Sequence, residues 1–122
     1  MSAAKPVVVY QYPKCSTCRK ALKWLDAQGV TYESVDIVER PPSATALAKA
    51  MKLGDLELRR LFNTSGQSYR AGGWKDRLAS TAKADALAAL AADGKLIKRP
   101  LVLGDGVALV GFDADEWAAE LL

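Results

Sequence analysis

The chain contains only two cysteines, Cys15 and Cys18, separated by two residues in the stretch YPKCSTCRKALKWL. Such a C-x-x-C pair can act as a redox dithiol, supply half of a metal site, or place two small apolar side chains one helical turn apart. The sequence has no histidine, which excludes Cys–His and Ser–His catalytic pairs and zinc sites of the Cys₂His₂ and Cys₃His types. Two thiolates would complete a four-sulfur site only in a dimer, so we expect no metal and favour thiol redox chemistry.

The residues around the cysteines predict the elements that position them. Residues 7–12, VVVYQY, are β-branched and aromatic, which is typical of a buried strand. From 16 to 28 apolar residues recur at helical spacing, and Gly29 is a natural stop for that helix. Residues 30–38 alternate as a second strand. Strand, helix and strand in this order predict a βαβ unit with a parallel, right-handed crossover.

This placement gives each cysteine a different expected role. Cys15 lies where the helix begins, and the free N–H groups and positive dipole end there favour a thiolate. Lys14, Arg19 and Lys20 add positive charge nearby, so we expect a Cys15 pKa below the free value of about 8.5. Cys18 lies one turn further into the helix. We therefore expect Cys15 to be the exposed attacking thiol and Cys18 the shielded resolving thiol.

The rest of the chain predicts a helical middle and a β-rich end. The middle comprises a helix from the N-cap Ser43 to Met51, a second helix from the N-cap Asp55 to Leu61, a polar, glycine-bearing loop at 63–76, and an alanine-rich helix at 82–94 with Leu87 and Leu90 inward. The end comprises two strands within 99–112 that turn at Gly104-Asp105-Gly106, then a helix at 113–122 with Asp113 as N-cap and Trp117 and Leu121 on one face.

A second candidate site lies at IKRP, residues 97–100, which leads into the third predicted strand. A proline before a strand is often only a strand boundary. In a thioredoxin-like layout, however, a cis-proline at this point packs beside the active cysteine. Arg99 fits either a solvated surface charge or a guanidinium that holds an oxyanion or a second thiolate near Cys15. The residues alone leave both interpretations of Arg99 open.

Five blocks of the sequence together resemble the arsenate reductase–like (ArsC/Spx) family: YPKCSTCRKALKWL, PPSATAL, LFNTSGQSYR, GKLIKRPL and VGFDADEW. They follow the order and spacing of that family through essentially the whole chain. The resemblance implies an α/β fold with a thioredoxin-like, mixed four-stranded sheet. It also implies one domain over residues 1–122, with a helical insertion at roughly 40–95 and a cis peptide bond at Arg99–Pro100.

The resemblance also assigns roles to particular residues. Arsenate reductases of this type use one catalytic cysteine, which matches Cys15, and bind the oxyanion with three arginines. Arg99 matches one of these arginines, whereas the positions of the other two fall on Asn63 and Gly111. Spx-type regulators of the same family carry a C-x-x-C as a redox switch and bind RNA polymerase through the carboxy-terminal domain of its α-subunit. The insert stretch FNTSGQSYR is typical of an uncharacterised branch related to Spx.

These observations lead to one preferred function and two alternatives. The preferred function is a thiol–disulfide oxidoreductase in which Cys15 attacks, Cys18 resolves and Arg99 assists. The residues expected to border the substrate are Lys14, Ser16, Thr17, Asn63 and Pro100. Thr64, Ser65 and Tyr69 fit either a pocket border or turn hydrogen bonds. The alternatives are an Spx-type regulator that binds RNA polymerase, and a glutathione- and glutaredoxin-dependent arsenate reductase.

Composition restricts the partners and the compartment. The net charge is +3 and no block of like charge stands out, so we expect no direct binding of nucleic acid. No apolar segment approaches the roughly 20 residues that span a bilayer, and no apolar run of signal-peptide length precedes Lys14. We therefore expect a cytoplasmic monomer without a bound cofactor. Its substrate would be a small oxyanion, thiol or disulfide, and its electron donor glutathione, glutaredoxin or thioredoxin.

Overall fold

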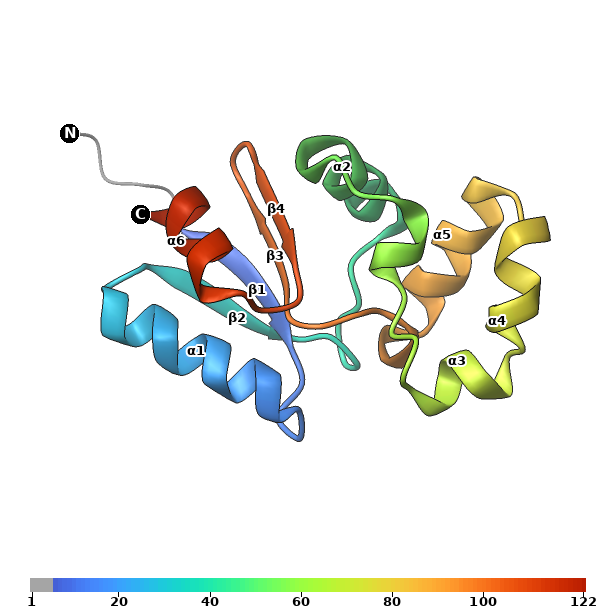
Figure 1. Ribbon diagram of the computed structural model, residues 1–122, viewed down its shortest axis with the longest axis horizontal. Helices are drawn as coiled ribbons and strands as arrows, with labels where there is room; N and C mark the ends of the chain where they lie inside the picture. Colours follow the sequence, from blue (N-terminus) through green and yellow to red (C-terminus); the bar gives the residue numbers. More distant parts are fainter. Residues whose placement is uncertain (1–5) are drawn as a thin grey trace.

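The computed structural model describes residues 6–122. Residues 1–5, which begin the segment where we expect no signal peptide, lie outside the described residues. In chain order the elements are β1 (Val7–Gln11), α1 (Ser16–Gln28), β2 (Tyr32–Asp36), α2 (Ala44–Gly54), the 3₁₀ helix η1 (Leu58–Leu61), α3 (Gln67–Ala71), α4 (Trp74–Arg77), η2 (Leu78–Ser80), α5 (Lys83–Ala92), η3 (Gly94–Leu96), β3 (Leu101–Gly104), β4 (Val107–Val110) and α6 (Ala114–Leu121) (Figure 1).

The strands form one four-stranded sheet in the order β2-β1-β3-β4. β1 and β2 run parallel and are joined by α1, whereas β3 runs antiparallel to both β1 and β4. Between β2 and β3 the chain leaves the sheet and forms the helices from α2 to α5. The predicted fold class is confirmed: this is a mixed, thioredoxin-like sheet with a helical segment between its second and third strands.

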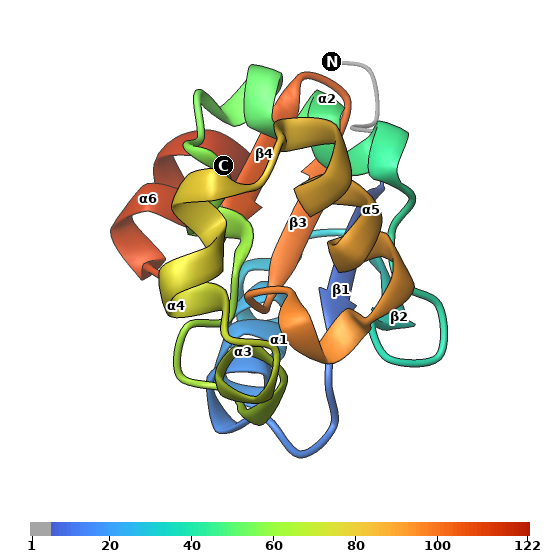
Figure 2. The same ribbon diagram turned by 90° about the vertical axis from the view of Figure 1, so that its right-hand side faces the viewer.

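The sheet separates two hydrophobic clusters. Because successive side chains of a strand point to opposite faces, Val102 and Leu109 face the cluster that includes α1 and α6. Their neighbours Leu101 and Val110 face the cluster that includes α2, α5 and the other insert residues. Figure 2 shows α3, α4 and α5 stacked in front of the sheet on this second side. The helical segment and half of the sheet therefore share one core.

Most of the predicted elements are confirmed. α1 has the predicted bounds, and Gly29 ends it in the left-handed conformation at φ 71°. Ser43 caps α2 by accepting a hydrogen bond from the N–H of Ala46, and Asp113 caps α6 in the same way. The hairpin between β3 and β4 turns at the predicted Asp-Gly pair, with Gly106 at φ 76°. No helix among residues 6–122 has the length and apolar character needed to cross a membrane.

Two predictions for the helical middle were wrong. Asp55 does not begin a helix; it is the left-handed C-cap of α2, which continues to Gly54, and the next element is the short helix η1. The stretch 63–76 is not a loop, because it contains the short helices α3 and α4. Tyr69 and Trp74 are buried there and both pack on the ring of Phe62. The burial of these aromatic rings outweighs the polar, glycine-rich composition that indicated a loop.

Candidate active site

The two cysteines lie at the first turn of α1. Cys15 is the N-cap residue, and its Sγ accepts a hydrogen bond of 3.2 Å from the backbone N–H of Cys18. A backbone N–H at a helix N-terminus stabilises negative charge on the atom that accepts its hydrogen bond. Cys15 is half-buried, whereas Cys18 is fully buried. Both are free thiols.

The environment of Cys18 keeps it protonated. Burial, followed by the hydrogen bond with the side chain of Cys15, raises the pKa of Cys18 from 9.0 to about 12. The backbone hydrogen bond with Tyr12, and after it the nearby positive charge of Arg99, act in the opposite direction but are smaller influences. At neutral pH Cys18 is therefore a neutral thiol that lies behind the more accessible sulfur of Cys15.

Arg99 and Pro100 lie in the segment before β3, and Arg99 lines the same cavity as Cys15. The peptide bond between them is cis, as the family resemblance implied. The Arg99 guanidinium lies over the ring of Tyr12, 5.0 Å from its centroid, and donates a long hydrogen bond of 3.4 Å to the carbonyl of Lys95. Arg99 is thus held by a cation–π contact at one side of the site.

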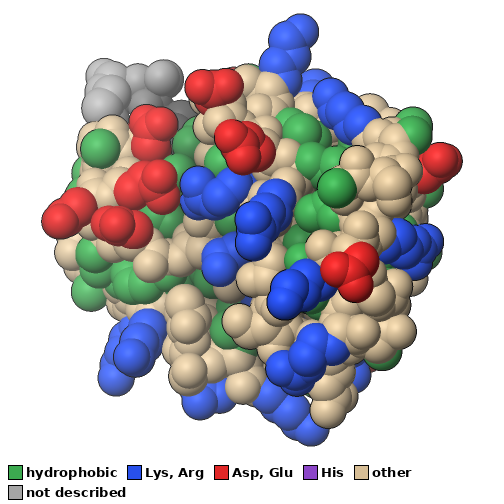
Figure 3. Space-filling view, turned by 45° about the vertical axis from the view of Figure 1, so that its right-hand side comes forward, with side chains coloured by type: hydrophobic (Ala, Val, Ile, Leu, Met, Phe, Trp, Pro, Cys, Tyr) green, Lys and Arg blue, Asp and Glu red, His purple; other side chains and the backbone are tan. Residues whose placement is uncertain are grey.

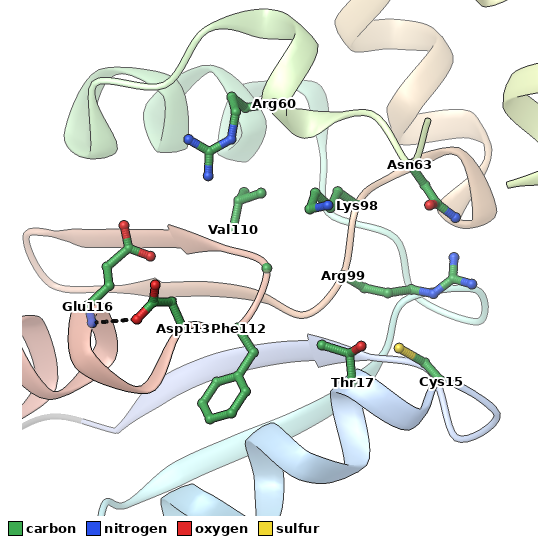
Figure 4. Close-up of a pocket in the computed structure, with 11 residues that line it drawn as sticks. Cys15, Thr17, Arg60, Asn63, Lys98, Arg99, Val110, Phe112, Asp113 and Glu116 are labelled. Carbon is green, nitrogen blue, oxygen red and sulfur yellow. Dashed lines mark hydrogen bonds between the residues drawn. The ribbon is translucent and has the colours of Figure 1, made fainter. Parts of the chain in front are cut away.

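A cavity of about 500 Å³ opens beside Cys15. Figure 4 shows its walls: Cys15 and Thr17 on α1 at the bottom, Arg60 from η1 at the top, Lys98 and Arg99 between them, and the start of α6 at the left. Its lining residues are Cys15, Thr17, Arg60, Asn63, Lys98, Arg99, Val110, Gly111, Phe112, Asp113 and Glu116. The cavity therefore combines a thiol with side chains of both charges.

The helical segment reaches this cavity through a short antiparallel contact with the residues before β3. Phe62 and Ile97 form an isolated β-bridge. On one side of it, the N–H of Lys98 donates to the carbonyl of Leu61 at 2.8 Å, and on the other the N–H of Asn63 donates to the carbonyl of Leu96 at 2.8 Å. These backbone bonds place Asn63 and η1 beside Lys98, although they are far apart in the sequence.

The opposite end of the cavity depends on Gly111. Its N–H donates to the carbonyl of Pro100 at 2.9 Å, and its own carbonyl accepts a hydrogen bond of 3.0 Å from Nε1 of Trp117. Gly111 has a φ of 72°, which favours glycine over any side chain. A fully buried tryptophan therefore fixes the backbone that leads from β4 to Asp113.

The structure brings together some of the predicted site residues and separates others. Cys15, Thr17, Asn63 and Arg99 line the cavity, Cys18 is buried behind Cys15, and Pro100 is buried. Ser16 lines a different hollow along α1, and Lys14 is exposed and is not part of the cavity lining. Tyr69 belongs to the core and Thr64 and Ser65 are exposed.

The cavity also has four lining residues that were not predicted from the sequence: Arg60, Lys98, Asp113 and Glu116. The sequence contains one indication that Lys98 could belong to the site, namely its position next to Arg99 in IKRP. It contains none for Arg60 and Glu116, because an exposed charge at the end of a short helix is ordinary surface composition. Within residues 6–122 no group of three His, Cys, Asp or Glu side chains is arranged to hold a metal ion.

The comparisons with known proteins bear on this cavity. The model of the ArsC family matches residues 10–120. The chain belongs to the ArsC family. Among its relatives, the uncharacterized protein YusI of Bacillus subtilis is 43% identical over 108 residues, covering 88% of this chain and 92% of that protein. An arsenate reductase of Neisseria meningitidis is 31% identical, covering 86% and 89%. The global transcriptional regulator Spx of Lactiplantibacillus plantarum is 21% identical, covering 90% and 82%.

Solved structures of ArsC-like proteins have the same fold. A putative ArsC family related protein from Bacteroides fragilis superposes with a TM-score of 0.91 at 38% identity, covering 96% of this chain and 98% of that one. A possible arsenate reductase from Streptococcus mutans gives a TM-score of 0.85 at 41% identity, covering 95% and 99%. This protein is thus a thioredoxin-fold member of the ArsC family that is related to arsenate reductases and to Spx. Membership of this family is a family-level indication of an oxidoreductase.

Proposed function

We propose that this protein is a thiol–disulfide oxidoreductase in which Cys15 is the nucleophile and Cys18 the resolving thiol. The observation that carries the proposal is the pairing of an accessible sulfur with a buried one. Cys15 lines the cavity and accepts the N–H of Cys18, while the Cys18 thiol is buried and hydrogen-bonded to Cys15. An attacking thiolate needs access, and a resolving thiol needs proximity without access.

The proposed reaction has two exchange steps. The Cys15 thiolate attacks one sulfur of a substrate disulfide, the disulfide bond breaks, and the first thiolate leaves and takes up a proton. Cys18 then loses its proton and attacks the Cys15 sulfur, which releases the second thiolate and forms a Cys15–Cys18 disulfide. Two electrons pass from the protein to the substrate. A reductant of the glutathione, glutaredoxin or thioredoxin class returns them to the protein, and a reducing cytoplasm is the compartment that suits this cycle.

Arg99 assists in this proposal from the lining of the cavity that it shares with Cys15. Like the stronger backbone hydrogen bond with Tyr12, its positive charge acts to lower the pKa of Cys18, toward the thiolate that the second step requires. Its stacking on Tyr12 fixes the distance over which this charge acts. Thr17 and Asn63 border the substrate in the same cavity. Pro100 is buried next to Arg99 in the sequence and is expected to support the site without touching the substrate.

The test follows the fate of each cysteine. Reduced protein treated with a small excess of a neutral disulfide is quenched with acid and analysed by mass spectrometry. Wild type is expected to lose two hydrogens and form an internal disulfide, and Cys18→Ser to accumulate a mixed disulfide at Cys15. Cys15→Ser is expected to react no faster than denatured protein at the same pH. A wild-type rate in Cys15→Ser, or no internal disulfide in wild type, would overturn the proposal.

The relation to Spx favours a second candidate function, a redox-switched regulator. In this proposal the Cys15–Cys18 disulfide changes the affinity for RNA polymerase, at the carboxy-terminal domain of its α-subunit. Purified protein, reduced and oxidised, is passed over that domain in immobilised form, with Cys15→Ser as a variant that cannot switch. Equal retention of both forms, or none of either, would exclude the regulator.

The arsenate reductase relatives favour a third candidate, reduction of arsenate. Asn63 and Gly111 stand where the resemblance places two anion-binding arginines, but Arg60 and Lys98 bring other positive charges to the same cavity. Protein is assayed with arsenate, glutathione and glutaredoxin. A rate equal to that of the protein-free mixture would exclude this activity and leave the disulfide reductase proposal intact.

A further inference from the structure

The cavity beside Cys15 holds opposite charges that do not neutralise one another. Arg60 and Lys98 contribute positive charge, and Asp113 and Glu116 contribute negative charge. Within residues 6–122, no hydrogen bond or ion pair engages the side chains of Arg60, Lys98 or Glu116. All three are exposed to solvent. One carboxylate oxygen of Asp113 already has hydrogen-bond partners. Its Oδ1 accepts the N–H groups of Asp115 and Glu116, and Figure 4 draws the bond from Glu116.

The backbone fixes where the lysine charge lies. The N–H of Lys98 is bonded to the carbonyl of Leu61. A Cβ on Gly111 would lie 3.2 Å from Cε of Lys98, so the lysine stem passes over this glycine and occupies the space that a side chain there would take. Because Gly111 is itself held by Pro100 and Trp117, the stem of Lys98 rests on a rigid surface.

Charge is also unevenly distributed over the surface. In Figure 3 Lys and Arg side chains gather over the middle of the face and several Asp and Glu side chains gather to their left, on the side where Figure 1 draws α6, while an acidic side chain also lies among the basic ones. A multiply charged tetrahedral oxyanion would be attracted by the first group and repelled by the second. A ligand that carries one carboxylate and one ammonium is attracted by both groups. The volume of about 500 Å³ is within the range of small-molecule sites.

We propose that this cavity binds the α-amino-acid group of a small disulfide. One sulfur of the disulfide lies against Cys15. The half of the molecule that points away from Cys15 has its carboxylate against Lys98 and Arg60 and its ammonium against Glu116, at the end of the cavity where Figure 4 draws Arg60 and Glu116. The inference rests on the proposed disulfide reductase function and specifies its substrate class. It also gives Lys98 and Glu116 the role of specificity residues, which bind substrate and take no part in the exchange of sulfur.

The exchange steps are those already given, with an amino-acid disulfide as oxidant. Cys15 forms a mixed disulfide with one half, and the other half leaves as a thiolate and is protonated. The leaving half is the one whose carboxylate and ammonium are bound, so its sulfur is aligned for displacement by Cys15. Cys18 then attacks the Cys15 sulfur, the second half leaves as a thiolate, and the dithiol has been oxidised by two electrons.

The test compares four disulfides of different charge with the reduced protein: cystine with both charges, 3,3′-dithiodipropionate with carboxylates only, cystamine with ammonium groups only, and neutral bis(2-hydroxyethyl) disulfide. Formation of the internal disulfide is followed by acid quench and mass spectrometry. Each rate is divided by the rate of the same disulfide with dithiothreitol, which removes differences in intrinsic reactivity. The ratio of each corrected rate to that of the neutral disulfide reports selectivity.

Wild type is expected to select cystine above the other three. Lys98→Gln and Arg60→Gln are each expected to lower the ratios for cystine and dithiodipropionate by about three- to fivefold, the size of an exposed charge interaction. Glu116→Gln is expected to lower the ratios for cystine and cystamine by a similar factor and to raise that for dithiodipropionate. Lys49→Gln on α2 removes an exposed charge outside the cavity and is expected to change no ratio.

The outcomes separate this inference from the function on which it rests. If the neutral disulfide oxidises the protein and the four ratios are equal, the α-amino-acid site is overturned and the reductase proposal stands. If none of the four disulfides forms the internal bond, the reductase proposal fails. In that case the rates at which negatively charged iodoacetate and neutral iodoacetamide alkylate Cys15 still test whether Lys98 and Glu116 act on a charged ligand. A rate ratio of the two reagents that is the same in wild type, Lys98→Gln and Glu116→Gln would overturn the charged site as well.

Discussion

The two walls of the cavity are built in different ways. The sulfur wall comes from the first turn of α1, where Cys15 and Cys18 are three residues apart and local hydrogen bonds, among them the one from the Cys18 N–H to the Cys15 Sγ, set their geometry. The charged wall comes from η1, the segment before β3 and the start of α6. Its residues meet only because Lys98 pairs with Leu61 and Gly111 pairs with Pro100.

This difference separates reactivity from recognition. A helix N-terminus produces the same sulfur environment wherever a strand leads into a helix with this spacing. Charges on separate elements can be exchanged one at a time without disturbing that environment. In this chain Asn63 and Gly111 belong to the charged wall, and Lys98 occupies the space beside Gly111. Substitutions can therefore act on the two walls separately.

The largest expected effect comes from breaking the sulfur wall. Cys15→Ser is expected to reduce disulfide reduction to the protein-free rate with every substrate, because a hydroxyl cannot replace the thiolate in exchange. Stopped-flow or quench measurements with the neutral disulfide check it. Lys98→Gln, on the charged wall, is the matched comparison and is expected to keep turnover of that disulfide measurable. Equal loss in the two variants would contradict the separation of the walls.

The next largest effect is expected from substitutions of Trp117, which supports the backbone of the charged wall. Trp117 is fully buried, stacks edge-on with Trp24 and Phe112, and holds the carbonyl of Gly111. Trp117→Ala is expected to lower the free energy of unfolding by about 3–5 kcal/mol, measured by denaturant titration. Trp117→Phe keeps a ring but loses the hydrogen bond, and is expected to cost about 1–2 kcal/mol. Equal costs for the two variants would show that the ring contributes nothing.

The pH dependence of folding stability tests the environment of the buried Cys18 thiol. The folded state raises the pKa of Cys18 from 9.0 to about 12, so above pH 9 the unfolded chain loses a proton that the folded chain keeps. The contribution of Cys18 to the free energy of unfolding is therefore fully present below pH 9 and is lost as the pH rises toward 12. From pH 8 to 10 wild type is expected to lose about 1–2 kcal/mol more than Cys18→Ala. Urea titrations at the two pH values measure this difference, and parallel pH profiles would contradict it.

A stability effect of similar size, with a small change in selectivity, tests the position of the Lys98 side chain over Gly111. Gly111→Ala places a side chain at φ 72°, with a Cβ 3.2 Å from Cε of Lys98, and is expected to cost about 1–2 kcal/mol of stability. It is also expected to lower selectivity for carboxylate disulfides, because the lysine is displaced. Gly106→Ala is the matched control, since its φ is 76° but no atom lies within 4 Å of the added Cβ. The control is expected to carry a similar stability cost with no change in selectivity.

Sequence reasoning succeeded where the signal was local. The strand before Pro13, the helix that ends at Gly29 and the hairpin at Asp105-Gly106 all follow from backbone preferences of a few neighbouring residues. It failed at 63–76, because Tyr69 and Trp74 find their partner Phe62 only after the chain has folded. The polar composition of this segment therefore gave no indication of the two short helices α3 and α4.

The same distinction applies to the site. The sequence by itself determined that Cys15 stands at a strand-to-helix junction with Cys18 one turn behind, since both positions are set by helix geometry. The family resemblance implied the cis bond at Arg99–Pro100, and the structure shows it. Only the tertiary structure decided which charges surround the sulfur. Arg60, Lys98 and Glu116 are exposed residues without any periodic pattern, and backbone pairing between distant segments brings them to one cavity.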